Sequence, residues 1–264
     1  MTRTIGIDVG GTKVAAGVVD IESGTVLRLI EQPTRADLGG RSVLDLCGGL
    51  IAELNGDGLP VGIGLCELID RDGHIRSGVT VDWQHLDIEA ALGPVALESD
   101  VRAAALAEAR FGAGRGRDNF LYLSIGTGVA HTLVLAGKPY PGAHGYAIMV
   151  GAPPIEHTSS GAALATAAGT DTHSVLADAA HASLVESASR LLGQALASLI
   201  HAFDPGVVII GGGLGLNSKY RSRIAAATKA NLATKELTET PILAAELGKS
   251  AGIVGAALIA ASSD

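Results

Sequence analysis

Cysteine, aromatic residues and charged residues are all scarce in this chain of 264 residues. The two cysteines, Cys47 and Cys66, are too few for a disulfide framework or a cysteine-based zinc site. Charged residues make up 17% of the chain, below the roughly 25% of an average protein. The 19 Lys and Arg against 27 Asp and Glu give a net charge of −8, which shows no sign of a nucleic-acid-binding surface. We therefore expect neither a disulfide-stapled domain nor a nucleic-acid partner.

Long hydrophobic runs are also missing. The longest apolar stretches, such as 207–210 and 253–261, are much shorter than the ~20 residues that a membrane-spanning helix needs. The first residues lead directly into a strand-like segment without the pattern of a signal peptide. We expect a cytoplasmic protein that does not bind a membrane.

Glycine, in contrast, is abundant: its 36 residues are about twice the average usage. They follow no three-residue period and proline is scarce, which excludes collagen and low-complexity disorder. Hydrophobic residues make up 47% of the chain and are mostly Ala, Val, Leu and Ile. This high hydrophobic content also argues against disorder. The composition indicates a compact aliphatic core with many tight backbone positions. It suits an enzyme that holds phosphates with backbone amides, and equally any other compact α/β protein.

Strands and helices alternate along the chain, and one pattern occurs twice. In the first half we expect strands at 4–9, 12–20, 25–31 and 61–65 and helices at 42–54 and 101–110. In the second half we expect strands at 120–125, 129–136 and 207–210 and helices at 184–203 and 251–261. A strand, a glycine turn and a returning strand thus recur after about 118 residues, which is a repeat at the scale of a domain. The sequence predicts an α/β protein of two similar domains, 1–115 and 116–249, with a cleft between them.

The two glycine turns have the chemistry of phosphate-binding loops. Glycines let the backbone turn tightly and bring its N–H groups close to an anion. The first turn adds the hydroxyl of Thr12 and the charge of Lys13, and Asp8 is placed to hold a water bound to Mg²⁺. One such turn alone is better explained as an ordinary β-turn, but the repetition of the turn at equivalent places favours phosphate binding. The candidate residues for binding a nucleotide are Asp8, Gly10, Gly11, Thr12 and Lys13 in the first turn and Gly126, Thr127 and Gly128 in the second.

Taken together, these motifs resemble those of the ROK family of sugar kinases and related regulators, within the actin–hexokinase superfamily. Residues 5–13 and 126–128 are similar to the family's two phosphate motifs, and residues 204–213 to its adenosine motif. Residues 98–100, with the Ala-rich helix to Glu108, resemble its Glu-Asn-Asp segment, and residues 252–257 its final helix. The resemblance adds Gly211, Gly212 and Gly213 to the nucleotide-binding candidates.

The resemblance implies a ribonuclease-H-like fold in each domain, with the C-terminal helix at about 250–264 packed on the first. It implies transfer of a phosphoryl group from ATP, with Mg²⁺, to a sugar hydroxyl, which in the family is the primary 6-hydroxyl. Asp100 then matches the catalytic base, which accepts the hydroxyl proton. The alternative interpretation is that Asp100 only caps the following helix. The family also implies a homodimer.

Departures from the family pattern concern the sugar site. Tyr146 stands where the family has a sugar-contacting Glu, and Met149 stands where it has a His that contacts sugar and zinc. The cysteine-rich zinc loop is missing between Met149 and Glu156, so we expect no structural zinc. Glu156 is similar to the family's sugar-binding Glu after that loop, and we expect it to bind sugar.

Acidic residues suggest an unusual sugar. Glu67 stands where the family has a glycine that approaches the 3-position of the sugar, and a carboxylate there suits an ammonium group. A solvated charge at a strand end is the alternative interpretation of Glu67. Asp82 offers another acid, Ser99 replaces an Asn beside the base, and His144 and Tyr146 border the same pocket. The hypothesis is an amino-sugar kinase of antibiotic biosynthesis, with kanosamine (3-amino-3-deoxyglucose) as the leading substrate.

Three alternatives remain open. One is a C7-cyclitol kinase of secondary metabolism, and another is a glucokinase that uses ATP or polyphosphate. The third is a sugar-binding sensor that has lost catalysis. Regulators of the family carry an N-terminal DNA-binding domain, for which the first strand leaves no room here.

Overall fold

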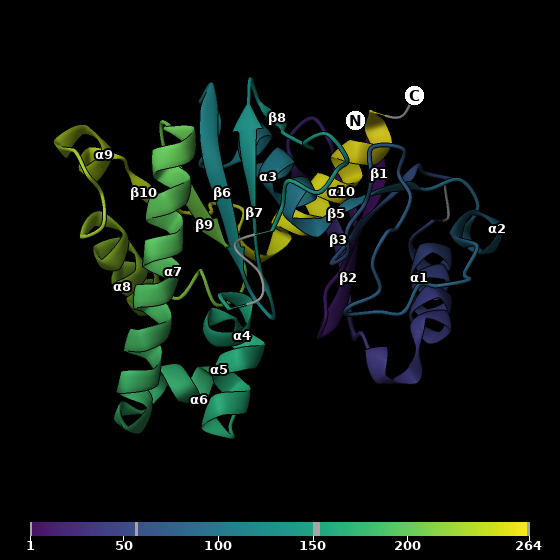
Figure 1. Cartoon of the computed structure of the whole chain (residues 1–264). Coiled ribbons are helices and arrows are strands. Elements are labelled where there is room, and N and C mark those ends of the chain that lie inside the picture. The colour runs from purple at the N-terminus through teal and green to yellow at the C-terminus, as the bar shows by residue number, and fades with distance from the viewer. Residues whose placement is uncertain (1, 56–57, 150–153, 263–264) are drawn as a thin grey trace. The chain divides into compact units, whose positions relative to one another are not determined.

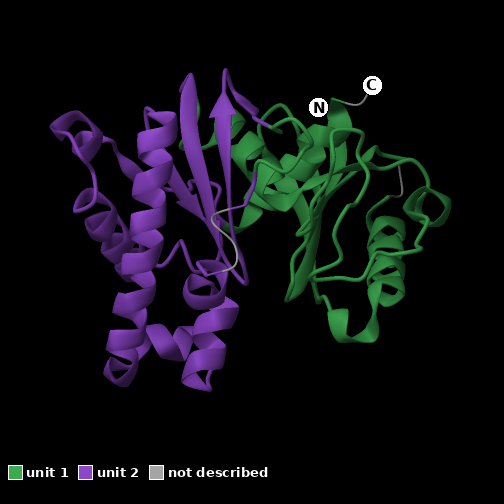
Figure 2. Ribbon diagram, in the orientation of Figure 1, with its two compact units in different colours: residues 1–115, 141–147, 249–264 green, residues 116–140, 148–248 purple. Residues whose placement is uncertain are grey.

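The computed structural model describes residues 2–55, 58–149 and 154–262 (Figure 1). The chain forms two compact units, shown in different colours in Figure 2. The first comprises residues 1–115, 141–147 and 249–264, and the second comprises 116–140 and 148–248. Each unit contains one five-stranded sheet, so the α/β class is confirmed. The segment 141–147, which the sequence assigned to the second domain, packs with the first unit instead.

The two sheets share one topology. In the first unit, the strand order is β3-β2-β1-β4-β5: β1 (Arg3–Val9), β2 (Lys13–Asp20), β3 (Thr25–Pro33), β4 (Val61–Leu65) and β5 (Ala96–Ser99). In the second, it is β10-β9-β6-β7-β8: β6 (Asn119–Ile125), β7 (Val129–Leu135), β8 (Lys138–Pro139), β9 (Val208–Gly211) and β10 (Ile242–Ala244). In both, the first strand pairs antiparallel with the second and parallel with the next strand across. This shared order accounts for the repeat in the sequence.

The helices differ more between the units. The first unit has α1 (Gly40–Leu54), α2 (Ile88–Leu92), α3 (Asp100–Phe111) and α10 (Ala251–Ala261), with a 3-10 turn at Ala36–Leu38. The second has α4 (Glu156–Ser159), α5 (Gly161–Ala168), α6 (Thr172–Ala177), α7 (Ala182–Phe203), α8 (Ser218–Lys229) and α9 (Lys235–Glu239), with a 3-10 turn at Ala179–His181. A third 3-10 turn, Gly248–Ser250, precedes α10. Among the described residues, no helix is both long enough and apolar enough to cross a membrane.

Strand β1 has two different faces because successive side chains of a strand point to opposite sides. Ile5, Ile7 and Val9 belong to the apolar cluster that β1, β4 and α1 form. The alternate residues face α10: the Thr4 hydroxyl donates a hydrogen bond to the carbonyl of Ala257 at 3.0 Å. One face of the sheet is therefore covered by bulky aliphatic packing and the other by a helix at close range.

Glycine makes that close range possible. A Cβ atom added to Gly6 would lie 1.9 Å from the carbonyl oxygen of Ile253, and one added to Gly62 of β4 equally close to that of Ala256. From the helix side, a Cβ on Gly255 would lie 1.8 Å from the carbonyl oxygen of Ala103 in α3. The backbone of α10 thus touches β1, β4 and α3 directly, at positions that accept no side chain.

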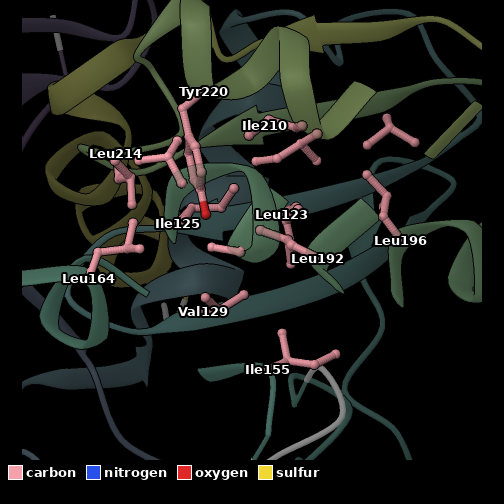
Figure 3. Packing of buried hydrophobic residues seen from close by; sticks show 14 of the residues in the cluster. Leu123, Ile125, Val129, Ile155, Leu164, Leu192, Leu196, Ile210, Leu214 and Tyr220 are labelled. Atoms are coloured by element: carbon pink, nitrogen blue, oxygen red, sulfur yellow. The ribbon is translucent and has the colours of Figure 1, made fainter. Parts of the chain in front are cut away.

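The second unit packs its sheet against α7 and α8 (Figure 3). Leu123 and Ile125 of β6 and Ile210 of β9 lie in one buried cluster with Leu192 and Leu196 of α7. Tyr220 of α8 is fully buried in this cluster, and its hydroxyl donates to the carbonyl of Ser159 at 3.1 Å. The ring thus fills apolar space while its polar end is satisfied.

Replacing Gly255 by Ala should destabilise the protein. The added methyl group has no room against Ala103, so we expect the free energy of unfolding to fall by about 1–3 kcal/mol or more, as for overpacked cores. Gly49→Ala is the matched control, since Gly49 lies in α1 with no atom within 4 Å of an added Cβ. There alanine should stabilise by about 0.5–1 kcal/mol. Urea unfolding measures both variants, and equal stability of the two would contradict the close packing of α10.

Candidate functional site

Three strand ends of the first unit bring acidic residues together. Strands β1, β4 and β5 are parallel, so their carboxyl ends meet at one edge of the sheet. Asp8 lies near the end of β1, Glu67 follows β4, and Asp100 follows β5 as the first residue of α3. Asp8 pairs in register with Gly64 of β4, and a Cβ on Gly64 would lie 3.5 Å from the Cα of Asp100. The topology thus places the predicted base beside the predicted Mg²⁺ ligand.

Asp8 and Asp100 are partly buried carboxyls with raised pKa values. The pKa of Asp100 is raised to about 7, mainly by burial and then by the charges of Asp8 and Glu67. The Val101 N–H, which donates to the carboxylate at 2.7 Å, opposes this shift. Burial raises the pKa of Asp8 to about 6, and the charge of Lys13 opposes this shift. A carboxylate with a pKa near 7 is well suited to accept a proton at neutral pH.

The start of α3 argues against a simple capping role for Asp100. Ser99 occupies the N-cap position, so Asp100 is already the first helical residue. The buried Ser99 hydroxyl donates to the carbonyl of Glu67 at 3.0 Å. Ser99 therefore has no exposed surface to offer a sugar in this structure, and it instead ties the base segment to the residue after β4.

Glu67 is turned inward, with only 3% of its surface exposed. Its carboxylate accepts the N–H groups of Val79, Thr80 and Val81 at 2.9–3.1 Å and the hydroxyl of Ser77. These four bonds use the roughly four acceptor positions of a carboxylate. Glu67 therefore holds the loop 77–81 in place, and it is neither solvated nor free to bind a substrate ammonium group directly.

Further candidates for sugar contact lie in the first unit. His144 and Tyr146 line a polar cavity of about 760 Å³, together with Asp70, Arg71, Asp72, Arg76 and Ala143. Its volume is within the range of small-molecule sites. Asp82 is exposed, directly after the loop 77–81 that Glu67 holds, and its carboxylate accepts the N–H of Gln84 at 3.0 Å. Residues 150–153, in the place of the family's zinc loop, lie outside the described residues.

One group of possible metal ligands also borders this cavity. The ligand atoms of Asp70, Asp72 and His74 lie within 4.8 Å of one another. The Asp70 carboxylate, however, accepts the N–H groups of Asp72 and His74 and pairs with Arg76, and these bonds lower its pKa to about 2. The proximity of these three residues is therefore explained by a turn that the Asp70 carboxylate stabilises through its own hydrogen bonds.

The first glycine turn joins β1 to β2. The N–H of Gly10 donates to the carbonyl of Lys13 at 3.0 Å, and the Thr34 hydroxyl donates to the carbonyl of Gly10 at 2.6 Å. The Lys13 ammonium group forms an ion pair with Glu31 of β3, with nearly half of each side chain exposed. A phosphate would have to compete with Glu31 for this lysine.

The predicted nucleotide motifs of the second unit lie at one edge of its sheet. Gly126 donates to the carbonyl of Gly128 at 2.9 Å within the turn between β6 and β7. The N–H groups of Leu214 and Gly215, just after Gly211–213, donate to the carbonyl of Ile125 just before this turn. The structure thereby joins two motifs that are about 85 residues apart in the sequence.

Glycine is required at several of these positions. Gly212 has a φ of +77°, and a Cβ on Gly211 would lie 2.1 Å from the Tyr122 hydroxyl oxygen. A Cβ on Gly213 would have no atom within 4 Å, so its backbone faces open space. A Cβ on Gly128 would lie 2.5 Å from a carboxylate oxygen of Glu156, which places Glu156 beside the second phosphate turn within the second unit.

Sequence reasoning missed Arg102. This buried arginine of α3 pairs with Glu98 and donates to the backbone carbonyls of Ile69 and Gly145. The available signal was a single charge on the otherwise apolar face of an Ala-rich helix.

Comparison with known proteins gives one consistent family. The ROK family matches residues 4–263. A glucokinase of Streptomyces coelicolor is 28% identical, over 100% of this chain and 99% of its own length. The crystal structure of a ROK family glucokinase from Streptomyces griseus, in complex with glucose and AMPPNP, superposes with a TM-score of 0.86 at 28% identity, covering 98% of this chain and 99% of that one.

A second solved structure is similar over both full lengths. The inorganic polyphosphate/ATP-glucomannokinase of Arthrobacter sp. strain KM is 31% identical, with a TM-score of 0.76 and full coverage of both chains. The family match over nearly the whole sequence agrees with the two-sheet topology and with the order of the glycine motifs. This chain belongs to the ROK family.

Proposed function

We propose that this protein is an ATP-dependent kinase that phosphorylates the 6-hydroxyl of a hexose, with Asp100 as the base. That it is a phosphotransferase acting on an alcohol group follows from its membership of the ROK family together with its full-length similarity to glucokinases. The single observation that carries the choice of base is the position of Asp100. It is a carboxyl with a pKa of about 7, at the edge where three parallel strands end.

In this mechanism, the sugar hydroxyl oxygen attacks the terminal phosphorus of ATP while its proton passes to the Asp100 carboxylate. The bond between that phosphorus and the bridging oxygen breaks, and ADP leaves with the electron pair. Such a transfer depends mainly on positioning and on neutralising negative charge. The charge of Asp8 beside Asp100 keeps the base easier to protonate at the moment of transfer.

Mg²⁺, when bound with the nucleotide, supplies positive charge to the phosphates. Asp8 fits this role by its chemistry, because hard divalent cations prefer oxygen ligands and water. Its carboxylate lies against α10, where a Cβ on Gly252 would be 2.3 Å from one oxygen. The residue opposite must therefore stay glycine for Asp8 to keep this place, and Asp8 would hold the ion through a water.

The glycine turns would hold the nucleotide with backbone N–H groups. We assign Gly10, Gly11, Thr12 and Lys13 of the first unit, and Gly126, Thr127 and Gly128 of the second, to the phosphates. Gly211–213 would contact the adenosine, where the open backbone at Gly213 would lie along a flat base. The AMPPNP in the Streptomyces griseus structure supports ATP as donor, and the Arthrobacter kinase keeps polyphosphate as an alternative.

Kanosamine is the proposed sugar, but the acid proposed to bind its ammonium group is no longer Glu67. The loss of the family's Glu and His at Tyr146 and Met149 supports a substrate other than glucose. Glu67, whose acceptors are all used, would act by shaping the loop 77–81 that leads to Asp82. Asp82, exposed beyond this loop, is then the acid offered to an ammonium group, and Glu156 stays a candidate within the second unit.

Asp100→Asn should fold and lose phosphoryl transfer. The amide still accepts the N–H of Val101 but cannot take the hydroxyl proton, so kcat should fall by about 10²–10⁴-fold. A coupled ADP assay with each candidate sugar measures the rate. Circular dichroism checks the fold. Retention of more than about a tenth of wild-type turnover would remove Asp100 as the base.

Activity should fall as the pH drops through about 7. Burial raises the pKa of Asp100 from the ordinary 3.8, so the ionised base is lost near neutrality and not near pH 4. We expect kcat/KM for the sugar, at saturating nucleotide, to decline below pH 7 with unit slope. The residual rate of Asp100→Asn should lack this decline. A flat wild-type profile from pH 8 to pH 5 would contradict the assignment.

Kanosamine should be phosphorylated more efficiently than glucose. Measurement of kcat/KM with ATP for glucose, kanosamine, glucosamine, N-acetylmannosamine and cyclitols tests this preference. Equal or better efficiency on glucose would exclude the amino-sugar proposal.

Because Glu67 supports a loop, Glu67→Gln should lower efficiency on kanosamine and glucose alike. A loss confined to kanosamine would show direct contact with the ammonium group. Glu89→Gln, on the exposed side of α2, is the control and should change neither.

A further inference from the structure

Arg102 lies two residues after Asp100 on α3, with only 3% of its side chain exposed. A buried guanidinium group is costly unless its charge and its N–H donors are matched. Here the charge is matched by Glu98 of β5, four residues earlier. The Glu98 carboxylate accepts a hydrogen bond from Nε of Arg102 at 2.8 Å and another from its Nη2. This pair fixes the guanidinium plane beside the start of α3.

The remaining donors of Arg102 reach two distant parts of the chain. Nη2 donates to the carbonyl of Ile69 at 3.0 Å, and Nη1 donates to the carbonyl of Gly145. One planar group thus binds the segment after β4 and the segment 141–147, both within the first unit. Arginine suits this task because its donors lie in a rigid fork, whereas lysine offers a single point charge on a flexible stem.

Both carbonyls belong to residues that are adjacent in sequence to lining residues of the polar cavity. Ile69 directly precedes Asp70, and Gly145 separates His144 from Tyr146; Asp70, His144 and Tyr146 all line the cavity. The walls are in direct contact at this point: Gly145 has a φ of +89°, and a Cβ on it would lie 2.4 Å from the Ile69 carbonyl oxygen. Arg102 therefore binds the two walls where they meet.

We propose that Arg102 is a positioning residue that fixes the cavity walls, and with them His144 and Tyr146, relative to Asp100. It would act through its bonds to Glu98 and to the two backbone carbonyls and not by contact with sugar or nucleotide. This inference rests on the proposed sugar kinase activity and deepens it. Removing Arg102 should leave the base and the nucleotide motifs intact but let both walls move, so the sugar is held less well.

The test compares Arg102→Met and Arg102→Lys with Arg110→Met, an exposed arginine of the same helix. We expect Arg102→Met to raise KM for the sugar at least tenfold while KM for ATP and kcat change by less than about threefold. Arg102→Lys, which keeps the charge beside Glu98, should not restore the sugar KM, and Arg110→Met should behave as wild type. An unchanged sugar KM in both Arg102 variants would overturn the proposal. So would an equal rise in both KM values, which indicates general damage.

Hydrogen exchange provides a readout that does not depend on activity. The N–H groups of Asp70 and Arg76 bond to the carbonyls of His74 and Leu68 at 3.0 and 2.8 Å, so both report on one wall. Ala147, whose N–H bonds to the carbonyl of Pro141, reports on the other. Faster exchange at these amides in Arg102→Lys, with unchanged exchange in β1, supports the positioning role even if no sugar is phosphorylated. Unchanged exchange at all three would overturn it, whatever the kinase assay shows.

Discussion

The direct backbone contact of α10 with the sheet is the constraint on which the first unit depends. Gly6, Gly62 and Gly255 remove the side chains that would keep the helix away, and Gly252 leaves space for the Asp8 carboxylate. On the same face of the sheet, Gly64 of β4 lies next to the backbone of Asp100, and a Cβ added to it would be 3.5 Å from the Asp100 Cα. The positions of the two acidic residues are thus set by close contacts between helix and strand backbones. The glycine excess is in part the requirement of this packing.

Two carboxylates of the first unit show how surroundings decide the role of an acid. Glu67 accepts four hydrogen bonds from the loop 77–81, and these make it a structural support. Asp100 accepts one from Val101, and burial together with the neighbouring charge of Asp8 raises its pKa to about 7. The same chemical group is therefore a structural hydrogen-bond acceptor in one place and a candidate proton acceptor in the other, because its surroundings differ.

The regular elements were predictable where the pattern was strong. Strand β4 has the predicted bounds, and so has α10, because each is bordered by polar or turn residues. Helices α5, α6 and α8 were missed because they are short or polar, and tertiary contacts such as that of Tyr220 stabilise them. The acids of the site were found from motifs, but the inward turn of Glu67 was not, since its four partners lie 10–14 residues away. Arg102 depends on contacts still further away in sequence, at Ile69 and Gly145, which no local pattern reveals.

The contribution of both chain ends to one unit also has a consequence during synthesis. Strand β1 is made long before α10, the helix that covers its second face. Domains usually fold as units while the chain leaves the ribosome, N-terminal parts first. Here the face of β1 formed by Thr4, Gly6 and Asp8 stays uncovered until α10 emerges. The Asp8 carboxylate therefore reaches its place only after α10 has left the ribosome.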